Sequence, residues 1–493
     1  MILALFVIAL QTPSAAPRAN RPATPRPTPT ALVARALDAI GGADAVRNMP
    51  GLTIEYYQMT LGLGQEETPT SPARATVTAG RTVTDWSGAR RAISTETRGP
   101  AGMVNRQRRV TVKGISMLES GTGAQQADPP GVVANVERLM RTAPERILLA
   151  ASEQPQTLSA IPAKEWRGDM ADGARYINGP DTLHLYFDRV SGLLLGTEQE
   201  TDDPILGDRR NATMFTRWQD AGGGVRLPRQ LDLAVNDRLQ SNIVVTAATV
   251  GAVPDSLFVI PDTIAARAQR LTPGAPPPPA APPVTLVELA PGVWRAEGGT
   301  HFSLIVEQPT QLVVVEAPQN AARTQSLLDT LRARFPQKRV GVVVNTHHHW
   351  DHAGGLRAAM AAGLPILTQR RNVAFVRGIA TARKTLAPDA LTRRAPVPPV
   401  RAVDDTVTLG TGDSRVVVYR LPTTHAEGML AAYVPAARLL FTSDVLTPGP
   451  NLPALGSGEI TALARTRGIA IERVVGGHGG IASWPDVEKA AGN

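Results

Sequence analysis

The sequence predicts an α+β protein of two domains, in which a mostly antiparallel β domain precedes a domain of alternating strands and helices. Pro-rich stretches at residues 13–30 and 271–284 are too poor in large apolar residues to pack. Strand-like runs with few helices lie between these stretches, whereas strands and helices alternate after the second one. We therefore expect an accessory domain at residues 31–265, a linker at 266–284 and a second domain at 285–493.

The composition narrows the classes of function. At 493 residues, with 43% hydrophobic and 19% charged residues, the chain is typical of soluble globular proteins. Its formal charge of +8 comes from scattered arginines without a block of like charges, so nucleic acid is not an expected partner. There is no cysteine, which excludes disulfides and thiolate metal sites. A metal ion would have to be held by His, Asp or Glu.

The N-terminus reads MILALFVIALQTPSAA, an apolar run too short to span a bilayer, followed by small residues where cleavage could occur. We expect a signal peptide at residues 1–16 and a Pro-rich tether at 17–30. The mature chain would then be exported, to the periplasm or beyond, without an integral membrane segment. No Lys or Arg precedes the apolar run, which leaves a disordered start as the alternative.

The accessory domain opens with a helical pattern at residues 31–49 that is broken at Gly41 and Gly42. A second helical pattern covers residues 132–151, and strand-like segments lie at 52–61, 108–118, 183–201 and 225–236. This layout resembles the curved half-barrel of bacterial lipoprotein-carrier proteins, which implies a concave face able to hold an acyl chain. The alternative is a sheet that packs beside the second domain and shapes the mouth of its site.

The second domain begins with short strands in residues 284–320. The pattern then predicts a helix at 324–335, a strand at 340–346 and a helix at 354–363. The last two enclose the stretch NTHHHWDHAGG, which contains four of the eight histidines. A cluster of four histidines and one aspartate thus directly follows an apolar strand.

The spacing in this stretch suits two neighbouring metal ions. His347 and His349 are two residues apart in an extended segment, so their side chains point to the same side. Asp351 and His352 follow at the turn into the next helix and can face a second point nearby. His348 alternates outward and is not an expected ligand.

Three further residues with ligand-type side chains follow predicted strands. His425 comes after the strand at 415–422, Asp444 after 438–443, and His478 after 471–477. In open α/β architectures, ligands bind at the carboxyl ends of the strands. A polar histidine cluster on a loop is the alternative, but three strands that end in this way argue against it.

The motif THHHWDHAGG and the order HxHxDH, His, Asp, His resemble the metallo-β-lactamase superfamily, whose fold is an αββα sandwich with a metal site between the sheets at one edge. The resemblance implies a first metal held by His347, His349 and His425, and a second metal held by three further ligands. These are Asp351, His352 and His478, with Asp444 bridging both metals.

One residue departs from the family pattern. Where many members have Asp at the end of the equivalent strand, this chain has Glu316. We interpret Glu316 as a carboxylate that orients the ligand loop, with a surface acid at a strand end as the alternative. His301, in GGTHFS, is a candidate contact for the substrate, with a strand-end histidine of no special role as the alternative.

The expected cofactors are two divalent metal ions, zinc first, with iron or manganese as alternatives, because nitrogen and oxygen ligands do not discriminate among them. Such a pair can hold a hydroxide at neutral pH, and Asp351 would align it as well as bind metal. The sequence therefore predicts a hydrolase that attacks the carbonyl of a small, possibly apolar lactam, ester, lactone or thioester.

The branch of the superfamily is narrowed further by Asp444, which favours a glyoxalase II-like metal site. Too few residues follow His478 for the helical domain that holds glutathione in glyoxalase II itself. Two other functions stay open from the sequence. One is an envelope protein that binds hydrophobic molecules and has a structural metal site. The other is a mononuclear iron enzyme that oxidises a persulfide and uses only the first metal.

Overall fold

The computed structural model describes residues 26–99, 103–271, 283–394 and 396–492. The expected signal peptide, most of the tether and most of the linker lie outside these residues. No helix in the described part of the chain is both long and apolar enough to cross a membrane.

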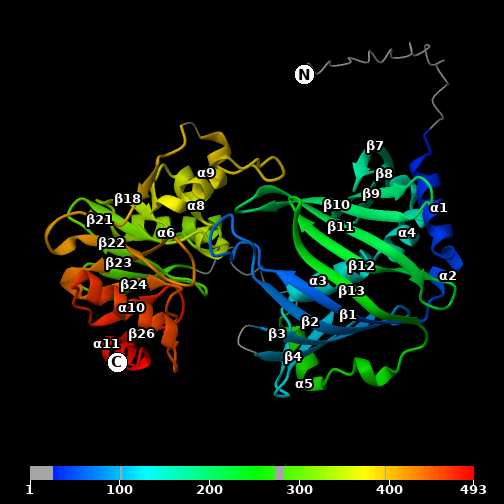
Figure 1. The fold of residues 1–493 in the computed structure, drawn as a ribbon, viewed down its shortest axis with the longest axis horizontal. Coiled ribbons are helices and arrows are strands. Elements are labelled where there is room, and N and C mark those ends of the chain that lie inside the picture. Colours follow the sequence, from blue (N-terminus) through cyan, green and yellow to red (C-terminus); the bar gives the residue numbers. More distant parts are fainter. Residues whose placement is uncertain (1–25, 100–102, 272–282, 395, 493) are drawn as a thin grey trace, which may run out of the picture.

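In the described part of the chain, thirteen strands form one antiparallel sheet in the N-terminal domain, on the right of Figure 1. They run in the order β6-β5-β4-β3-β2-β1-β13-β12-β11-β10-β9-β8-β7. Their bounds are β1 (Gly51–Leu61), β2 (Ala75–Asp85), β3 (Arg90–Arg98), β4 (Val104–Val112), β5 (Ile115–Ser120), β6 (Gln125–Ala127), β7 (Leu158–Trp166), β8 (Asp169–Asn178), β9 (Asp181–Asp188), β10 (Leu194–Asp203), β11 (Gly207–Asp220), β12 (Arg226–Val235) and β13 (Arg238–Val250).

The helices of this domain are α1 (Pro29–Ala39), α2 (Ala43–Arg47), α3 (Pro130–Arg141), α4 (Pro144–Glu153) and α5 (Asp262–Arg270). Helices α1 and α4 contribute Leu37 and Leu148 to a core that also contains Tyr176 of β8. Helix α5 packs Ile264 against strands β2 to β5 in a separate cluster.

Both helical patterns of this domain are interrupted. The expected break at Gly41 and Gly42 is confirmed, and Gly41 has a φ of +119° that disfavours other residues. The single helix expected at residues 132–151 is wrong, because the chain forms α3 and α4 with a break at Thr142 and Ala143. The reason is Pro144, which disfavours helical backbone at the preceding residue and begins α4.

In the described residues of the second domain, two further sheets pack face to face, with the strand orders β14-β15-β16-β17-β18-β19-β20 and β21-β22-β23-β24-β25-β26. Their bounds are β14 (Thr285–Ala290), β15 (Val293–Glu297), β16 (Ser303–Glu307), β17 (Gln311–Val315), β18 (Arg339–Val344), β19 (Ile366–Gln369), β20 (Val400–Val403), β21 (Thr406–Leu409), β22 (Val416–Leu421), β23 (Met429–Val434), β24 (Leu439–Ser443), β25 (Arg473–Gly476) and β26 (Ile481–Ser483).

Helices cover the outer face of each sheet, which gives the predicted αββα order. They are α6 (Ala321–Arg334), α7 (Trp350–Ala353), α8 (Leu356–Ala361), α9 (Val373–Thr381), α10 (Ala454–Arg467) and α11 (Trp484–Ala490). Because side chains alternate along a strand, Val306 points into the core between the sheets, whereas Ile305 packs in the cluster under α6 and α8. Leu440 likewise packs toward α10 and α11.

Two contacts between described residues join the N-terminal domain to the second domain. The hairpin between β10 and β11 inserts Ile205 into the core under α6 and α8. Beside it, the Asp208 carboxylate accepts hydrogen bonds from the backbone N–H groups of Thr385 and Leu386, at 2.9 and 3.0 Å. The second contact is the connection between β1 and β2, drawn in blue in Figure 1, which reaches the edge where the predicted metal ligands lie.

Candidate metal centre

The predicted ligands converge at the carboxyl ends of their strands and form two groups. In the first group, potential ligand atoms of His347, His349, His425 and Asp444 all lie within 4.8 Å of one another. Nδ1 of His349 lies 3.1 Å from Nε2 of His425. Nε2 of His347 is 4.0 Å from Oδ2 of Asp444. These atoms surround one point, as the ligands of a single ion would.

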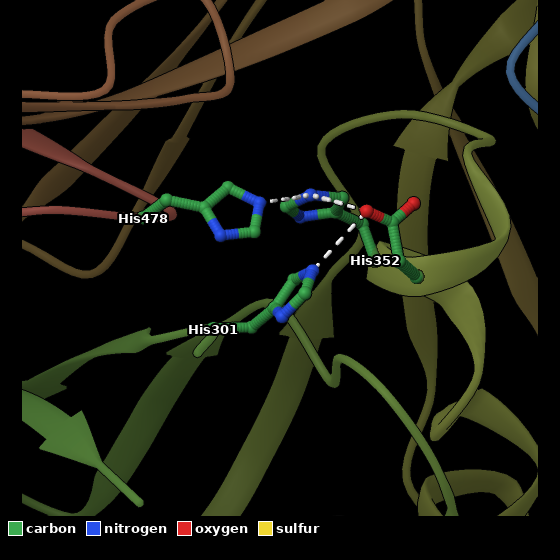
Figure 2. A group of neighbouring side chains, drawn as sticks. His301, His352 and His478 are labelled. Carbon is green, nitrogen blue, oxygen red and sulfur yellow. Dashed lines mark hydrogen bonds and ion pairs between the residues drawn. The ribbon is translucent and has the colours of Figure 1, made fainter. Parts of the chain in front are cut away.

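The second group contains Asp351, His352 and His478, together with His301. Figure 2 shows the three histidine rings converging from separate segments of the chain. Nε2 of His478 lies 3.3 Å from Nε2 of His352, and Oδ2 of Asp351 lies 3.6 Å from the same atom. A second ion could therefore be surrounded in the same way.

Asp444 connects the two groups. Its Oδ1 lies 2.9 Å from Nε2 of His352 and 3.2 Å from Nε2 of His478. Its Oδ2 lies 3.5 Å from Nε2 of His425, on the side of the first group. Each carboxylate oxygen thus faces a different group, which is the arrangement that a bridging ligand requires.

Hydrogen bonds on one ring nitrogen of several histidines leave the other nitrogen free for a metal. Thr346 donates its hydroxyl proton to Glu316 at 2.6 Å, so its oxygen can accept from Nδ1 of His347 at 3.0 Å. His478 donates from Nδ1 to the carbonyl of Thr300 at 2.9 Å. This assignment of tautomers leaves both Nε2 atoms as lone-pair donors.

The donor set fits metal ions. Nε2 of His347 is buried and has no hydrogen-bond partner among the described residues. Such an orphaned atom is costly to bury unless something else binds it. Two pairs of imidazole nitrogens also face each other at 3.1 and 3.3 Å, at the centres of the two groups. Nitrogen and carboxylate oxygen are the ligand types that zinc, iron and manganese accept.

Glu316 lies beneath the second group and is fully buried. Its Oε2 lies 3.0 Å from Nδ1 of His352, and its Oε1 accepts hydrogen bonds from Thr346 and Ser443. Glu316 and Ser443 have φ angles of +72° and +52°, which non-glycine residues rarely adopt. Backbone strain of this kind concentrates at functional sites.

The surroundings keep the histidines of the first group neutral. Burial lowers the pKa of His347 well below its usual value, and the neighbouring histidines lower it further. Burial also lowers the pKa of His425, to about 4, and that of His349. Neutral imidazole is the form that binds metal, so this group is ready for an ion at neutral pH.

In the second group, neighbouring carboxylates and histidines together shift each other's pKa values more strongly than burial does. Burial opposes the charge on His352, but Glu316 and Asp444 outweigh it and raise the pKa of that histidine. Burial likewise opposes ionisation of Asp444, but hydrogen bonds with His352 and His478 hold the pKa of this carboxyl far below its usual value. Asp444 is therefore ionised at neutral pH, as a bridging ligand must be.

The contacts of His301 and His348 were not predicted from the sequence. His301 lies within the second group, with Nε2 at 3.1 Å from Oδ2 of Asp351 and Nδ1 at 2.8 Å from the hydroxyl of Thr300. His348 joins neither group, as expected, yet it is buried rather than exposed. Its Nε2 lies 3.0 Å from the carbonyl oxygen of Glu66 in the N-terminal domain.

Sequence reasoning missed several residues that contact the ligands. Thr346 and Ser443 directly precede the predicted ligands His347 and Asp444. This position in the chain could have identified them as contacts of the site. Gln65 and Arg74 belong to residues 62–74, between two strands that pair as a hairpin. That connection is much longer than the roughly two to five residues usual for a hairpin, and long loops are often functional.

Comparisons with known proteins matched part of the chain. The family Lactamase_B, the metallo-beta-lactamase superfamily, matches residues 296–478. Similar solved structures include a metallo-beta-lactamase from Pontibacter korlensis, at 19% identity and a TM-score of 0.34, over 42% of this chain and 95% of that one. Another is FIM-1 from Pseudomonas aeruginosa in the mono-zinc form, at 17% identity and a TM-score of 0.35, over 43% of this chain and 96% of that one. Comparison with curated proteins gave no match.

The family match lies within the second domain. The N-terminal antiparallel sheet remains of unidentified type, so the half-barrel resemblance stays a prediction. The family match spans every strand end that carries a ligand, from the segment before Glu316 to His478. Residues 296–478 therefore form a domain of the metallo-beta-lactamase superfamily.

Proposed function

We propose that the chain is a hydrolase that binds two divalent metal ions, with zinc as the expected metal. His347, His349 and His425 would hold one ion, and Asp351, His352 and His478 the other. The observation that carries this proposal is the position of Asp444, whose two oxygens face the two groups separately.

The chemistry that a pair of such ions supplies when bound is activation of water near neutral pH and polarisation of a carbonyl group. The chain's own residues determine where this occurs. The side chains of Asp351, His425 and His478 are 35%, 27% and 25% exposed, whereas those of His347 and His352 are fully buried. A substrate would therefore approach along the edge formed by these three residues.

Asp351 would have a second role besides binding metal. It is the most exposed of the predicted ligands, and its two oxygens receive different partners, Gln65 at 2.8 Å and His301 at 3.1 Å. Burial opposes the charge on Asp351, but the hydrogen bond with His301 and the other contacts lower its pKa overall. The ionised carboxylate lies at the mouth of the site. There it can accept a hydrogen bond from a water molecule and hold that water for attack on a carbonyl carbon.

The substrate class that this site supports is a small lactam, ester, lactone or thioester. The two alternatives from the sequence receive less support. A mononuclear iron enzyme needs only the first group, whereas the second group is also brought together here. A protein that carries hydrophobic molecules needs an apolar cavity, whereas one hollow of about 600 Å³ in the N-terminal sheet mixes the charged Arg81 and Glu96 with Tyr56 and Tyr57.

The test uses the full chain, stripped of metal and then titrated with zinc. We expect about two zinc ions per chain by elemental analysis, and zinc-dependent hydrolysis of at least one of nitrocefin, a nitrophenyl ester, a lactone and a thioester. His347→Ala should abolish hydrolysis, and His184→Ala, which changes a histidine on β9, is the matched control. Zinc content near zero, or hydrolysis equal in the two variants, would refute the proposal.

Export to the periplasm or beyond remains a proposal from the N-terminal sequence. Cell fractionation of the native host, with N-terminal sequencing of the mature chain, tests it. A chain that keeps Met1 and stays in the cytoplasm would exclude a cleaved signal peptide.

A further inference from the structure

Residues 62–74, which we call the β1–β2 loop, lie against the predicted metal ligands although they belong to the N-terminal domain. The carbonyl oxygen of Glu66 lies 3.0 Å from Nε2 of His349 and 3.0 Å from Nε2 of His348. Because a carbonyl can only accept, each of these nitrogens carries the proton. His349 is thereby left with a lone pair on Nδ1, the atom that faces His425 at 3.1 Å.

Two side chains of the loop make further contacts with the site. Gln65 donates from Nε2 to Oδ1 of Asp351 at 2.8 Å, which restrains a ligand of the second group. Arg74 donates to the carbonyl oxygen of Thr424 at 2.9 Å and contacts that of His425 at 3.4 Å. The loop therefore touches His349, His425 and Asp351, which belong to both groups.

The backbone of the loop is also joined to the second domain. The carbonyl of Glu67 accepts a hydrogen bond from the N–H of Glu427 at 2.7 Å, and the carbonyl of Gly64 accepts one from the N–H of Trp350 at 3.2 Å. Both partners lie within two residues of a predicted ligand in sequence. Displacement of the loop would break the hydrogen bonds of these two N–H groups.

The N-terminal domain holds the loop in this shape. The Glu66 side chain is 2% exposed, and its carboxylate accepts from the N–H of Gly64 at 2.7 Å and pairs with Arg238 of β13. Across the base of the loop, the N–H of Gly62 donates to the carbonyl of Arg74 at 2.9 Å. The conformation that reaches the metal ligands is thus determined by contacts within the first domain.

We infer that the β1–β2 loop is a positioning element of the metal centre, so that metal affinity is a property of both domains together. The loop fixes the tautomer of His349 and the orientation of Asp351. This inference rests on the proposed function, since it concerns the same ions. Removal of an outer partner of a metal ligand commonly weakens metal binding about 10- to 100-fold.

Gly64 offers a sharp test, because a Cβ there would lie 2.2 Å from the indole ring of Trp350. Gly64→Ala would therefore push the loop away from the site. Gly123→Ala is the matched control: Gly123 has a φ of +82°, close to the +84° of Gly64, but a Cβ there would meet nothing within 4 Å. Both variants carry the same backbone strain, and only one displaces the loop.

The measurements are zinc affinity, by competition with a chromophoric chelator, and thermal unfolding of the metal-free chain. We expect Gly64→Ala to bind zinc at least tenfold more weakly than the parent chain and Gly123→Ala to match the parent. Thermal unfolding of Gly123→Ala measures how much an alanine with positive φ lowers the stability of the fold. A loss of zinc affinity in Gly64→Ala that Gly123→Ala does not show is then specific to the loop.

Gln65→Ala provides a milder second variant, which removes one hydrogen bond without strain. Its control is Gln125→Ala, which removes a bond of the same kind and 2.8 Å length to Glu119, far from the site in sequence. We expect weaker binding of one zinc ion in Gln65→Ala alone. Zinc affinity equal to the parent in both Gly64→Ala and Gln65→Ala would overturn the inference and leave the proposed function intact. A parent chain that binds no zinc would overturn both.

Discussion

Glu316 and His352 form a buried pair in which Oε2 lies 3.0 Å from Nδ1, and neither side chain is exposed to solvent. A carboxylate on one ring nitrogen orients the ring and makes the other nitrogen a stronger metal ligand. In His352 that other nitrogen lies 2.9 Å from Asp444. The pair thus connects the strained backbone at Glu316 to the second group of ligands.

Glu316→Gln should weaken the second zinc ion about 10- to 100-fold and leave the first nearly unchanged, because only His352 loses its charged partner. Chelator competition on the full chain separates the two affinities. Should the variant keep both affinities while its melting temperature falls, Glu316 would be a structural acid and not an orienting one.

Asp444→Ala should keep the first zinc ion, whose three histidines are unchanged, and bind the second much more weakly. Activity should fall by about a hundredfold, the equivalent of ~3 kcal/mol in transition-state stabilisation. Asp444→Asn should be milder, since the amide oxygen can still bind one ion. Elemental analysis beside steady-state kinetics decides the matter, and two retained ions with normal turnover would exclude the bridging role.

His301→Ala should keep two zinc ions and lower activity about 10- to 100-fold, because Asp351 loses the partner on Oδ2 that orients it. Loss of the second ion would instead make His301 a metal ligand. A rise in KM with kcat unchanged would make it the substrate contact that the sequence suggested. Zinc content and both kinetic constants, measured on the same preparation, distinguish these roles.

The metal-free chain should lose stability as pH falls from about 6.5 to about 4. Burial lowers the pKa values of His348 and His425 to about 4, whereas an unfolded histidine has a pKa of about 6.5. Below pH 6.5 these two histidines bind protons in the unfolded chain but not in the folded chain, so unfolding is favoured. His352 acts in the opposite sense, because its pKa is raised: the folded chain keeps this proton where the unfolded chain loses it, so its contribution to stability is complete only below about pH 6.5.

Urea unfolding of the metal-free protein at pH 7 and pH 5 measures this loss. His348→Gln removes one of the responsible groups without changing a predicted ligand, so its loss of stability between the two pH values should be smaller than that of the parent. An equal loss in both proteins would show that His348 does not titrate as described.

Local patterns predicted much of the second domain. The strand at 340–346 became β18 and the helix at 324–335 became α6, because a short apolar run in the first and helical spacing in the second coincide with burial. The ligand positions followed from polar residues at strand ends. The pattern failed at residues 132–151, where one apolar period continues across two helices and only Pro144 marks the break.

The sequence by itself determined the identity and order of the predicted metal ligands, because their spacing along strands and turns is a local property of the chain. Only the tertiary structure decided which ring nitrogen of several histidines is left free for a metal ion, and that the N-terminal domain contacts the predicted ligands. Those features depend on hydrogen bonds between segments far apart in sequence, such as Glu66 to His349, and the local pattern of neither segment contains the other.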